Sequence, residues 1–363
     1  MHVETSPGTS RRRRTVVAAA GIVALLAVGG IIAYRLSLSS RQGATLSRSS
    51  CLDNSPGRIS RLTGPDPVSF ETDAGRTYDA RGERFTDTQE GVNAGVLEPK
   101  YAESVCIVGP TLIGPLTSRF TWDSALKPDG VQWYRPTGRH ELRGAWIARV
   151  NDALSPPKDP EITRNAHFVF RDIYAREIRD DALENDACLG GEIHDSLFDG
   201  VHMGFASRPG SGNLVEVGPN MPVVRISNTM LRLACQTDVR ADSSCAGGTS
   251  HAQWFKLANP SNPNKCVTSD GRLAPHYRLT NVILRADSVP RDGVSALALP
   301  AEGTYQNVTV LYTGPGTLPS MPPGVTVVTD AVSANQIWNS AREKWLDAHG
   351  CDAMGNNCSL LAR

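Results

Sequence analysis

The triplet Ile193-His194-Asp195 is one of six short stretches that share a pattern: an apolar residue, any residue, and then Asp or Asn. The other five are Val150-Asn151-Asp152, Phe170-Arg171-Asp172, Ile226-Ser227-Asn228, Leu279-Thr280-Asn281 and Tyr305-Gln306-Asn307. With the weaker triplet Leu257-Ala258-Asn259 included, successive Asp/Asn positions are 20, 23, 33, 31, 22 and 26 residues apart, by subtraction of their numbers. A recurrence of roughly 20–30 residues is typical of a stacked repeat architecture. Because the units alternate in polarity as strands do, the pattern predicts a parallel β-solenoid.

The repeated Asp and Asn residues have a structural interpretation. Both residue types tolerate left-handed backbone and form local hydrogen bonds, so they suit the tight bends between strands. We therefore expect them to form a ladder at one turn of the solenoid, and the ladder alone assigns no functional site. Residues 51–330 are expected to form the β-helix domain, whose first coils include the β-like runs 68–70, 106–108 and 131–134.

Composition narrows the classes of protein. The chain has 363 residues with 37 basic and 37 acidic side chains, which argues against a general nucleic-acid-binding protein. Gly (33) and Pro (24) are plentiful and aromatic residues make up only 6%. This composition fits turn-rich β structure better than a helical bundle.

The N-terminal segment has the features of a membrane anchor. Residues 1–14 end in the basic run Arg11–Arg14, and residues 15–34 contain no charged residue. Twenty helical residues at about 1.5 Å each span a hydrocarbon layer of about 30 Å. The preceding arginines predict a cytoplasmic N-terminus and an exported domain, with residues 35–50 as a polar, flexible stalk. A cleaved signal peptide and a secreted protein are the alternative.

Cysteine usage agrees with export. The chain contains eight cysteines, namely Cys51, Cys106, Cys188, Cys235, Cys245, Cys266, Cys351 and Cys358. An even number in an exported domain predicts disulfides. Short separations favour the pairs Cys235–Cys245 and Cys351–Cys358. The pairs Cys51–Cys106 and Cys188–Cys266 would complete the set, although spacing does not determine the connectivity.

Residues 331–363 are expected to form a C-terminal helix and a disulfide-closed tail. Ser333-Ala334-Asn335-Gln336 has the spacing of a capping box, and Gly350 is a suitable helix end. Five apolar residues lie on one helical face: Ile337, Trp338, Ala341, Trp345 and Leu346. We expect this face to pack across the last coils and cap the open edge of the stack.

Polar residues are densest between Arg176 and His202. Asp181 and His202 are 21 residues apart and Arg225 follows after 23, so the three are expected to lie above one another on successive coils. Carboxylates in such a row protonate a leaving oxygen or activate water, and arginine holds an acidic sugar. The candidate catalytic residues are Asp180, Asp181 and His202. The candidate substrate-binding residues are Arg179, Arg225 and His194, and the structural alternative is a solvated turn whose charges satisfy loop amides.

These repeats resemble the right-handed parallel β-helix class, the pectin-lyase-like superfamily. The local motifs are most similar to those of polygalacturonases, which read Asn-Thr-Asp, Gly-Asp-Asp, Gly-His-Gly and Arg-Ile-Lys in order. The corresponding stretches here are Asn151-Asp152, Arg179-Asp180-Asp181, residues 200–204 around His202, and Arg225-Ile226-Ser227. The sequence departs from the pattern by a missing threonine, an extra residue on either side of His202, and Ser227 in place of lysine. The likeness covers about 80 residues.

The N-terminal segment predicts an exported, membrane-tethered protein. The resemblance implies that it acts on or binds polysaccharide, with hydrolysis of acidic glycans as the first enzymatic hypothesis. A polysaccharide lyase is the second, often using Ca²⁺ held by Asp and Glu, although no calcium-binding loop is evident in the sequence. The third is a surface solenoid without catalysis that binds glycan or protein. No cofactor is required by the first or third hypothesis.

Overall fold

The computed structural model describes residues 58–64, 66, 68–87, 95–101, 103–115, 128–135, 137–156, 166–209, 214–235, 251–257 and 265–351. The chain divides at residue 50 into two units, and the described residues all belong to the second, Cys51–Arg363. The expected anchor at 15–34 and the stalk at 35–50 lie outside the described residues. In the described part, no helix is both long and apolar enough to cross a membrane.

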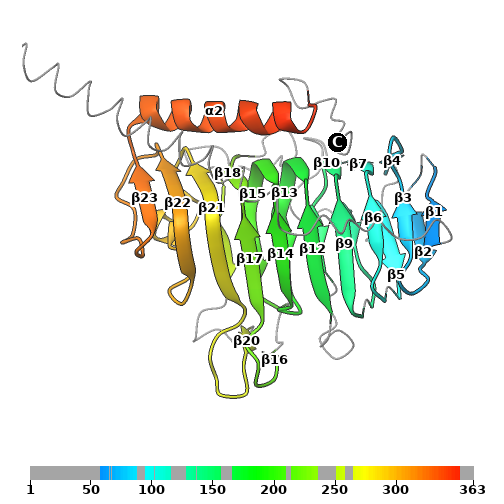
Figure 1. Ribbon diagram of the computed structural model, residues 1–363. Coiled ribbons are helices and arrows are strands. Elements are labelled where there is room, and N and C mark those ends of the chain that lie inside the picture. Colours follow the sequence, from blue (N-terminus) through cyan, green and yellow to red (C-terminus); the bar gives the residue numbers. More distant parts are fainter. Residues whose placement is uncertain are drawn as a thin grey trace, which may run out of the picture. The chain divides into compact units, whose positions relative to one another are not determined.

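The strands form one large parallel sheet whose pairings fall into three rows, compatible with the predicted solenoid (Figure 1). Each row contains strands from successive coils of the chain. Row 1 consists of β2 (Val68–Glu71), β5 (Leu97–Lys100), β8 (Val131–Gln132), β11 (Leu154–Ser155), the ends of β13 (Tyr174–Glu184) and β15 (Leu197–Ser207), and β19 (Phe255–Leu257). A separate small sheet pairs β16 (Leu214–Glu216) with β20 (Lys265–Val267).

Row 2 contains the strands that precede the Asp/Asn ladder. It consists of β1 (Ile59–Arg61), β3 (Thr77–Asp79), β6 (Cys106–Val108), β9 (Arg139–Arg143), β12 (His167–Arg171), β14 (Gly190–His194), β17 (Val223–Ser227) and the first halves of β21 (His276–Ala286) and β22 (Thr304–Tyr312). Row 3 follows the ladder. It consists of β4 (Arg84–Thr86), β7 (Thr111–Ile113), β10 (Trp146–Ala148), the starts of β13 and β15, β18 (Met230–Leu233), the second halves of β21 and β22, and β23 (Val325–Val328).

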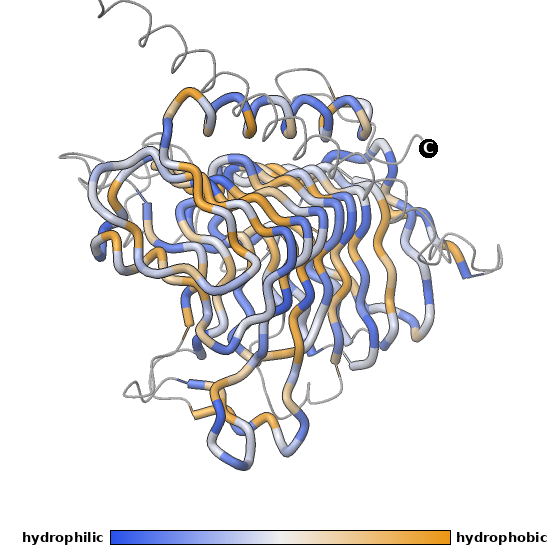
Figure 2. The backbone as a smooth tube through the Cα atoms, turned by 60° about the vertical axis from the view of Figure 1, so that its left-hand side comes forward, coloured by the Kyte–Doolittle hydropathy of each residue, from blue (hydrophilic) through white to orange (hydrophobic). Residues whose placement is uncertain are grey.

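Alternation of side chains builds the core. In β17 and the first half of β21, apolar residues at every second position are buried while the residues between them are exposed or half-buried. The apolar segments of successive coils lie above one another, as Figure 2 shows. Rings stack inside the coils, for example Phe168 on Phe170 with centroids 5.0 Å apart. The three rows therefore enclose one continuous core that runs along the stack.

The ladder between rows 2 and 3 confirms five of the six predicted positions. Asp172, Asp195, Asn228, Asn281 and Asn307 all have left-handed backbone, with φ between 46° and 56°. Asn281 donates its amide Nδ2–H to Asn228 Oδ1 at 3.0 Å, and Asn307 Nδ2 donates to Asn281 Oδ1 at 2.9 Å. Asp and Asn occupy this backbone region at lower cost than other residues with a Cβ atom, because their side chains hydrogen-bond locally.

The predicted ladder position of Asp152 is wrong. At the corresponding turn of its coil, between β9 and β10, the left-handed residue is Gly144 (φ 64°), and one coil earlier it is Gly109 (φ 77°). Glycine adopts this conformation without a side chain, so the Asp/Asn pattern stops there. Asp152 instead precedes β11, at the turn from row 3 to row 1. Asn259 lies outside the described residues.

Helix α2 (Ala331–Ala348) forms where a C-terminal helix is predicted, but it begins earlier and covers a different surface. Its N-cap is Asp330, whose Oδ2 accepts the Ser333 N–H at 2.7 Å, so Ser333 lies within the first turn rather than at the cap. The helix runs across the strands of row 3 instead of closing the end of the stack (Figure 1). Trp338 and Trp345 are buried there, as the packing interpretation predicts.

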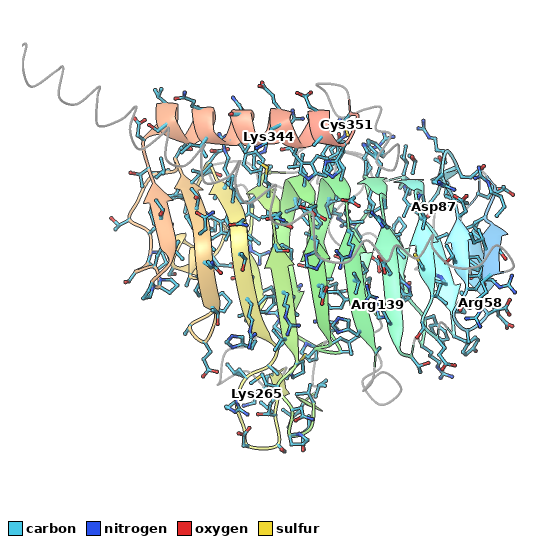
Figure 3. The ribbon with its side chains drawn as sticks, viewed as in Figure 1. Arg58, Asp87, Arg139, Lys265, Lys344 and Cys351 are labelled. Carbon is cyan, nitrogen blue, oxygen red and sulfur yellow. A yellow bond between two sulfur atoms is a disulfide. The ribbon has the colours of Figure 1, made fainter. Side chains whose placement is uncertain are left out.

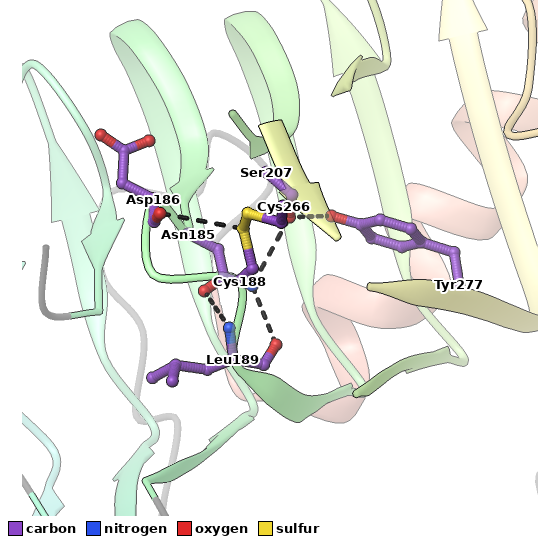
Figure 4. The surroundings of a disulfide bond; sticks show 7 residues. All are labelled: Asn185, Asp186, Cys188, Leu189, Ser207, Cys266 and Tyr277. Carbon is purple, nitrogen blue, oxygen red and sulfur yellow. Dashed lines mark hydrogen bonds between the residues drawn. A yellow bond between two sulfur atoms is a disulfide. The ribbon is translucent and has the colours of Figure 1, made fainter. Parts of the chain in front are cut away.

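One disulfide confirms a predicted pair. Cys188 is joined to Cys266, which fastens the turn after β13 to β20 of the small sheet (Figure 4). Cys106, Cys235 and Cys351 are also disulfide-bonded. The other three predicted pairs each include a cysteine that lies outside the described residues, and among the described cysteines none is free.

Candidate functional site

Five carboxylates gather where row 3 turns into row 1. We call Asp129, Asp152, Asp180, Asp181 and Glu184 the acid cluster. Carboxylate oxygens of Asp129, Asp152 and Glu184 lie within 4.8 Å of one another, and the same holds for Asp152, Asp180 and Asp181. The members come from three successive coils, ahead of β8, ahead of β11 and on β13. Asp129, Asp152 and Asp181 are almost completely buried.

Asp152 lies at the centre of the acid cluster and belongs to both groups of three. Its Oδ1 accepts the Asp181 backbone N–H at 2.9 Å, and its Oδ2 accepts Asn151 Nδ2–H at 2.9 Å. Burial raises the pKa of Asp152 well above its usual range, and the neighbouring carboxylates, Glu184 and Asp129 foremost, raise it further. Burial and the neighbouring carboxylates therefore favour the neutral form of Asp152.

Lys256 brings a cation into contact with the acid cluster. It extends from β19, and its Nζ lies 3.0 Å from Asp181 Oδ2. Burial alone would lower the pKa of Lys256, but Asp181, Asp180 and Asp152 outweigh it and raise the pKa. Burial also raises the pKa of Asp181, and the ammonium of Lys256 opposes this. Because the ammonium contacts Asp181 and not Asp152, the proton belongs on Asp152 and the negative charge on Asp181.

The register between β13 and β15 decides where the predicted catalytic residues lie. Ile178 pairs with Val201 but Asp181 pairs with Met203, so the strand β13 bulges at Arg179 and Asp180. His202 is therefore opposite the bulge, and the expected vertical pair of Asp181 and His202 is displaced by one residue. His202 is buried, as are Arg179 and Asp181. The structure thus brings Arg179, Asp180, Asp181 and His202 into one region of adjacent strands.

The predicted row from Asp181 through His202 to Arg225 is wrong. Arg225 lies on β17 in row 2, where it pairs in register with Glu192 of β14 and Arg278 of β21. His194 is also in row 2. Its Nε2 lies 2.8 Å from Glu192 Oε2, and its Nδ1 hydrogen-bonds Ser227. The hydrogen bond from His194 lowers the pKa of Glu192 to about 2, against burial, and Arg171 adds to this effect.

Sequence reasoning did not assemble this cluster. Asp129 was not singled out, and Glu184 was recognised only as part of the polar stretch from Arg176 to His202. Asp152 was assigned to the ladder and, through the resemblance, to the Asn151-Asp152 motif. The intervals of 23 residues from Asp129 to Asp152 and 29 from Asp152 to Asp181 are each about one coil, so spacing contained a signal. Lys256 had no such signal, because it lies 75 residues from Asp181 in the sequence.

The acid cluster could also bind a metal ion, because its carboxylate oxygens lie close together. Asp129, Asp152 and Glu184 offer the hard oxygen ligands that Ca²⁺ prefers. The second group of three already contains the ammonium of Lys256 beside Asp181. If calcium binds, it would therefore occupy the first group and displace the proton from Asp152.

A cavity of about 440 Å³ lies elsewhere, beside the Cys188–Cys266 disulfide. Its lining comes from Ala166 ahead of β12, from the turn before β14, and from β16 and the turn after it, where Val215 and Met221 lie. Glu216 of β16 is the lining residue that carries a carboxyl group. No member of the acid cluster contributes to it. We place the candidate site at the acid cluster because acid–base chemistry needs at least two titratable groups in contact.

Comparison with known proteins shows no family for this chain. No protein-family model matches it, and neither a curated protein nor a solved structure matches it significantly. The function is therefore inferred from the geometry of the acid cluster.

Proposed function

We propose that this chain is a carbohydrate-active, right-handed β-helix of the pectin-lyase-like kind that hydrolyses an acidic polysaccharide. The observation that carries the proposal is the contrast between two adjacent carboxyl groups. Asp152 is buried among carboxylates, which favours its neutral form, whereas Asp181 is paired with the ammonium of Lys256 at 3.0 Å, which favours its ionised form. A neutral acid beside an ionised carboxylate is the pair that glycoside hydrolysis requires.

The residues have different roles in this proposal. Asp152 donates its proton to the leaving glycosidic oxygen, and a carboxylate of the acid cluster activates water or attacks the sugar. Asp181, with Asp180 and His202 beside it, is the first candidate for that carboxylate. In this proposal, Lys256 keeps Asp181 ionised through their ion pair. Arg179 lies in the bulge of β13 beside Asp180 and Asp181 and helps to position these two carboxyl groups.

The test measures release of reducing ends from a panel of acidic and neutral polysaccharides, together with absorbance of unsaturated uronates. In Asp152→Asn, we expect reducing-end release to fall at least about 100-fold because the proton donor is lost. Asn resembles a neutral carboxylic acid in shape, so folding stability is expected to change little. Asp195→Asn is the matched control, since asparagine already fills the next three ladder positions.

The outcomes separate the alternatives. New absorbance without hydrolysis would indicate a lyase, and loss of that signal with EDTA would implicate calcium. Full activity in Asp152→Asn would exclude this residue as the acid.

A solenoid without catalysis that binds glycan is the second candidate. Asp152 and Asp181 are only 1% and 0% exposed, so a substrate reaches them only if the surrounding chain moves. Absence of activity across a broad panel, with binding retained, would favour this candidate. Both candidate functions include export of the domain and tethering through residues 15–34. The Cys188–Cys266 disulfide supports export, because disulfides persist in oxidising compartments.

A further inference from the structure

Row 2 presents a second polar surface, on a different side of the coils from the acid cluster. In β17, β21 and β22 the inward residues are apolar, and the outward residues alternate with them. Register places Arg225 beside Arg278, and Arg278 beside Thr304. It also places Ser227 beside Thr280. We call Arg225, Ser227, His276, Arg278, Thr280 and Thr304 the arginine face.

The outward arginines of row 2 differ in their ion pairs between the earlier and the later coils. In the earlier coils, three outward arginines have carboxylate partners. Arg139 pairs with Glu141 at 3.1 Å, Arg143 with Asp172 at 3.3 Å, and Arg171 with Glu192 at 3.4 Å. Figure 3 labels Arg139 on this surface.

Within the described residues, the outward arginines of the later coils have no ion pair of this kind. The strands β17, β21 and β22 contain no Asp or Glu at all. Arg225 and Arg278 are exposed, and neither forms an ion pair within the described residues. Glu192, the carboxylate in register with Arg225, is already held by His194 at 2.8 Å and by Arg171.

Two unpaired arginines on neighbouring strands oppose folding. Partners in adjacent strands lie about 4.8 Å apart, and like charges directly opposite each other destabilise a sheet. Placing Arg225 beside Arg278 does not stabilise the folded chain. The simplest reason for the arrangement is that the two arginines bind a ligand of opposite charge. Guanidinium groups bind carboxylate and sulfate through paired hydrogen bonds, and the hydroxyls of Ser227 and Thr280 flank them.

We propose that the arginine face binds an acidic polysaccharide, with its carboxylate or sulfate groups on Arg225 and Arg278 and its hydroxyls on Ser227 and Thr280. The strand spacing of about 4.8 Å is comparable to the length of one sugar unit along an extended chain. A single-stranded nucleic acid would need exposed aromatic rings for base stacking, but Tyr277 and Tyr305 on these strands are buried. A membrane would need exposed large apolar residues, and the arginine face has none.

The proposal shares its ligand class with the proposed function but uses a different surface, so the two can fail separately. Binding is measured with the full-length Asp152→Asn protein, which lacks the proposed proton donor. The probes are polygalacturonate and heparin, with dextran, duplex DNA and phosphatidylserine vesicles for comparison. We expect binding to one or both polyanionic sugars that weakens with salt, and no binding to dextran.

Substitution of the arginines tests the location. Arg278→Gln is expected to weaken binding about tenfold, and Arg225→Gln/Arg278→Gln further still. Arg139→Gln removes a charge of the same surface that is already paired with Glu141, so it should change the affinity less than about twofold. The melting temperature of Arg278→Gln should equal or exceed that of the parent protein, because a repulsion is relieved.

Three results would overturn the proposal: equal weakening by Arg139→Gln and Arg278→Gln, unchanged binding in the double variant, or no binding to any acidic sugar. Tighter binding of DNA or vesicles than of either polysaccharide would assign the surface to another class of partner. Full hydrolysis in Asp152→Asn, or no hydrolysis by the parent protein, together with intact binding to the arginine face would refute the catalytic proposal and leave this inference supported.

Discussion

At the scale of single residues, His140 shows how burial changes a titratable group. It lies on β9 inside the core, with its ring 5.2 Å from Trp133 and 6.5 Å from Phe168 between centroids. Neither ring nitrogen has a hydrogen-bond partner among the described residues. Burial, with a smaller contribution from His167, lowers the pKa of His140 to about 3. The imidazole is therefore neutral and packs as an aromatic ring.

This pKa predicts a dependence of stability on pH. The unfolded chain binds a proton on His140 below its ordinary pKa of 6.5, whereas the folded chain does so only below about 3. Stability is therefore lost as the pH falls through this window, by about 2 kcal/mol at pH 5. We expect His140→Phe to be more stable than the parent protein at pH 5, with a smaller difference at pH 8, in urea unfolding at both values. An unchanged pH dependence of stability in His140→Phe would contradict the assignment.

Asn281 combines two contributions at one residue. Its side chain donates to Asn228 and accepts from Asn307, and its φ is 56°. Asn281→Ala loses both hydrogen bonds and keeps an unfavourable backbone, so we expect a loss of about 2–3 kcal/mol in urea unfolding. Asn281→Gly loses the same hydrogen bonds but tolerates the backbone, so its loss should be smaller. Equal losses would mean that the backbone conformation contributes nothing.

At the scale of elements, α2 explains why row 3 can be apolar on its outer side. Outward residues of successive coils, including Tyr174, Leu197 and Met230, form a buried cluster with Trp338 and Trp345 of the helix. Polar contacts fix the helix in place. Arg342 Nε donates to Asp199 Oδ2 at 2.5 Å, and Trp345 Nε1 donates to the Asp195 carbonyl at 3.0 Å. The helix is thus a lengthwise cover and ties several coils together.

Trp345 is the residue whose loss should affect this cover most. Its ring lies 5.8 Å from that of Tyr174 and stacks on His349 at 3.8 Å. Trp345→Ala is expected to lower the free energy of unfolding by about 3–5 kcal/mol. Trp345→Phe retains most of the packing but lacks the indole N–H, so a loss of about 1 kcal/mol is expected. Chemical denaturation of both variants measures the difference, and equal losses would mean that packing on row 3 is unimportant.

At the scale of the whole molecule, the Cys188–Cys266 disulfide links parts of the chain separated by 78 residues. It holds the small sheet of β16 and β20 against the coils, where Val215 and Ala274 pack around it. Beside it, Asn185 Nδ2 donates to the Leu189 carbonyl at 2.9 Å, and the hydroxyls of Ser207 and Tyr277 share a hydrogen bond (Figure 4).

Removing this link tests its contribution to the molecule. We expect the double variant Cys188→Ala/Cys266→Ala to lose about 2–4 kcal/mol of stability, because the unfolded chain gains conformational freedom. Guanidinium unfolding measures the loss. The row 2 ladder lies apart from the small sheet, so Asn281→Ala in this background should show an additive effect. Strong coupling between the two changes would mean that the disulfide sets the register of the coils.

Local sequence was enough to predict the repeat and several features that depend on it. The Asp/Asn triplets predicted the strands, five positions of the ladder and the parallel stacking, because these depend on local alternation and on backbone conformations that few residues adopt. The C-terminal helix was also predicted from local residue types, although its N-cap lies at Asp330 instead of Ser333. The Cys188–Cys266 pair was offered only as one that would complete the set, because local sequence does not determine which distant cysteines meet.

Tertiary structure was needed to establish which polar side chains meet. The bulge at Arg179 and Asp180 shifts Asp181 from His202 to Met203, and a shift of one residue changes the face on which a side chain lies. Coils of unequal length separated Arg225 from the acid cluster and brought Lys256 to Asp181 from 75 residues away. Burial of Asp152 among other carboxylates depends on three coils at once. Such contacts depend on register between distant strands, which local spacing does not determine.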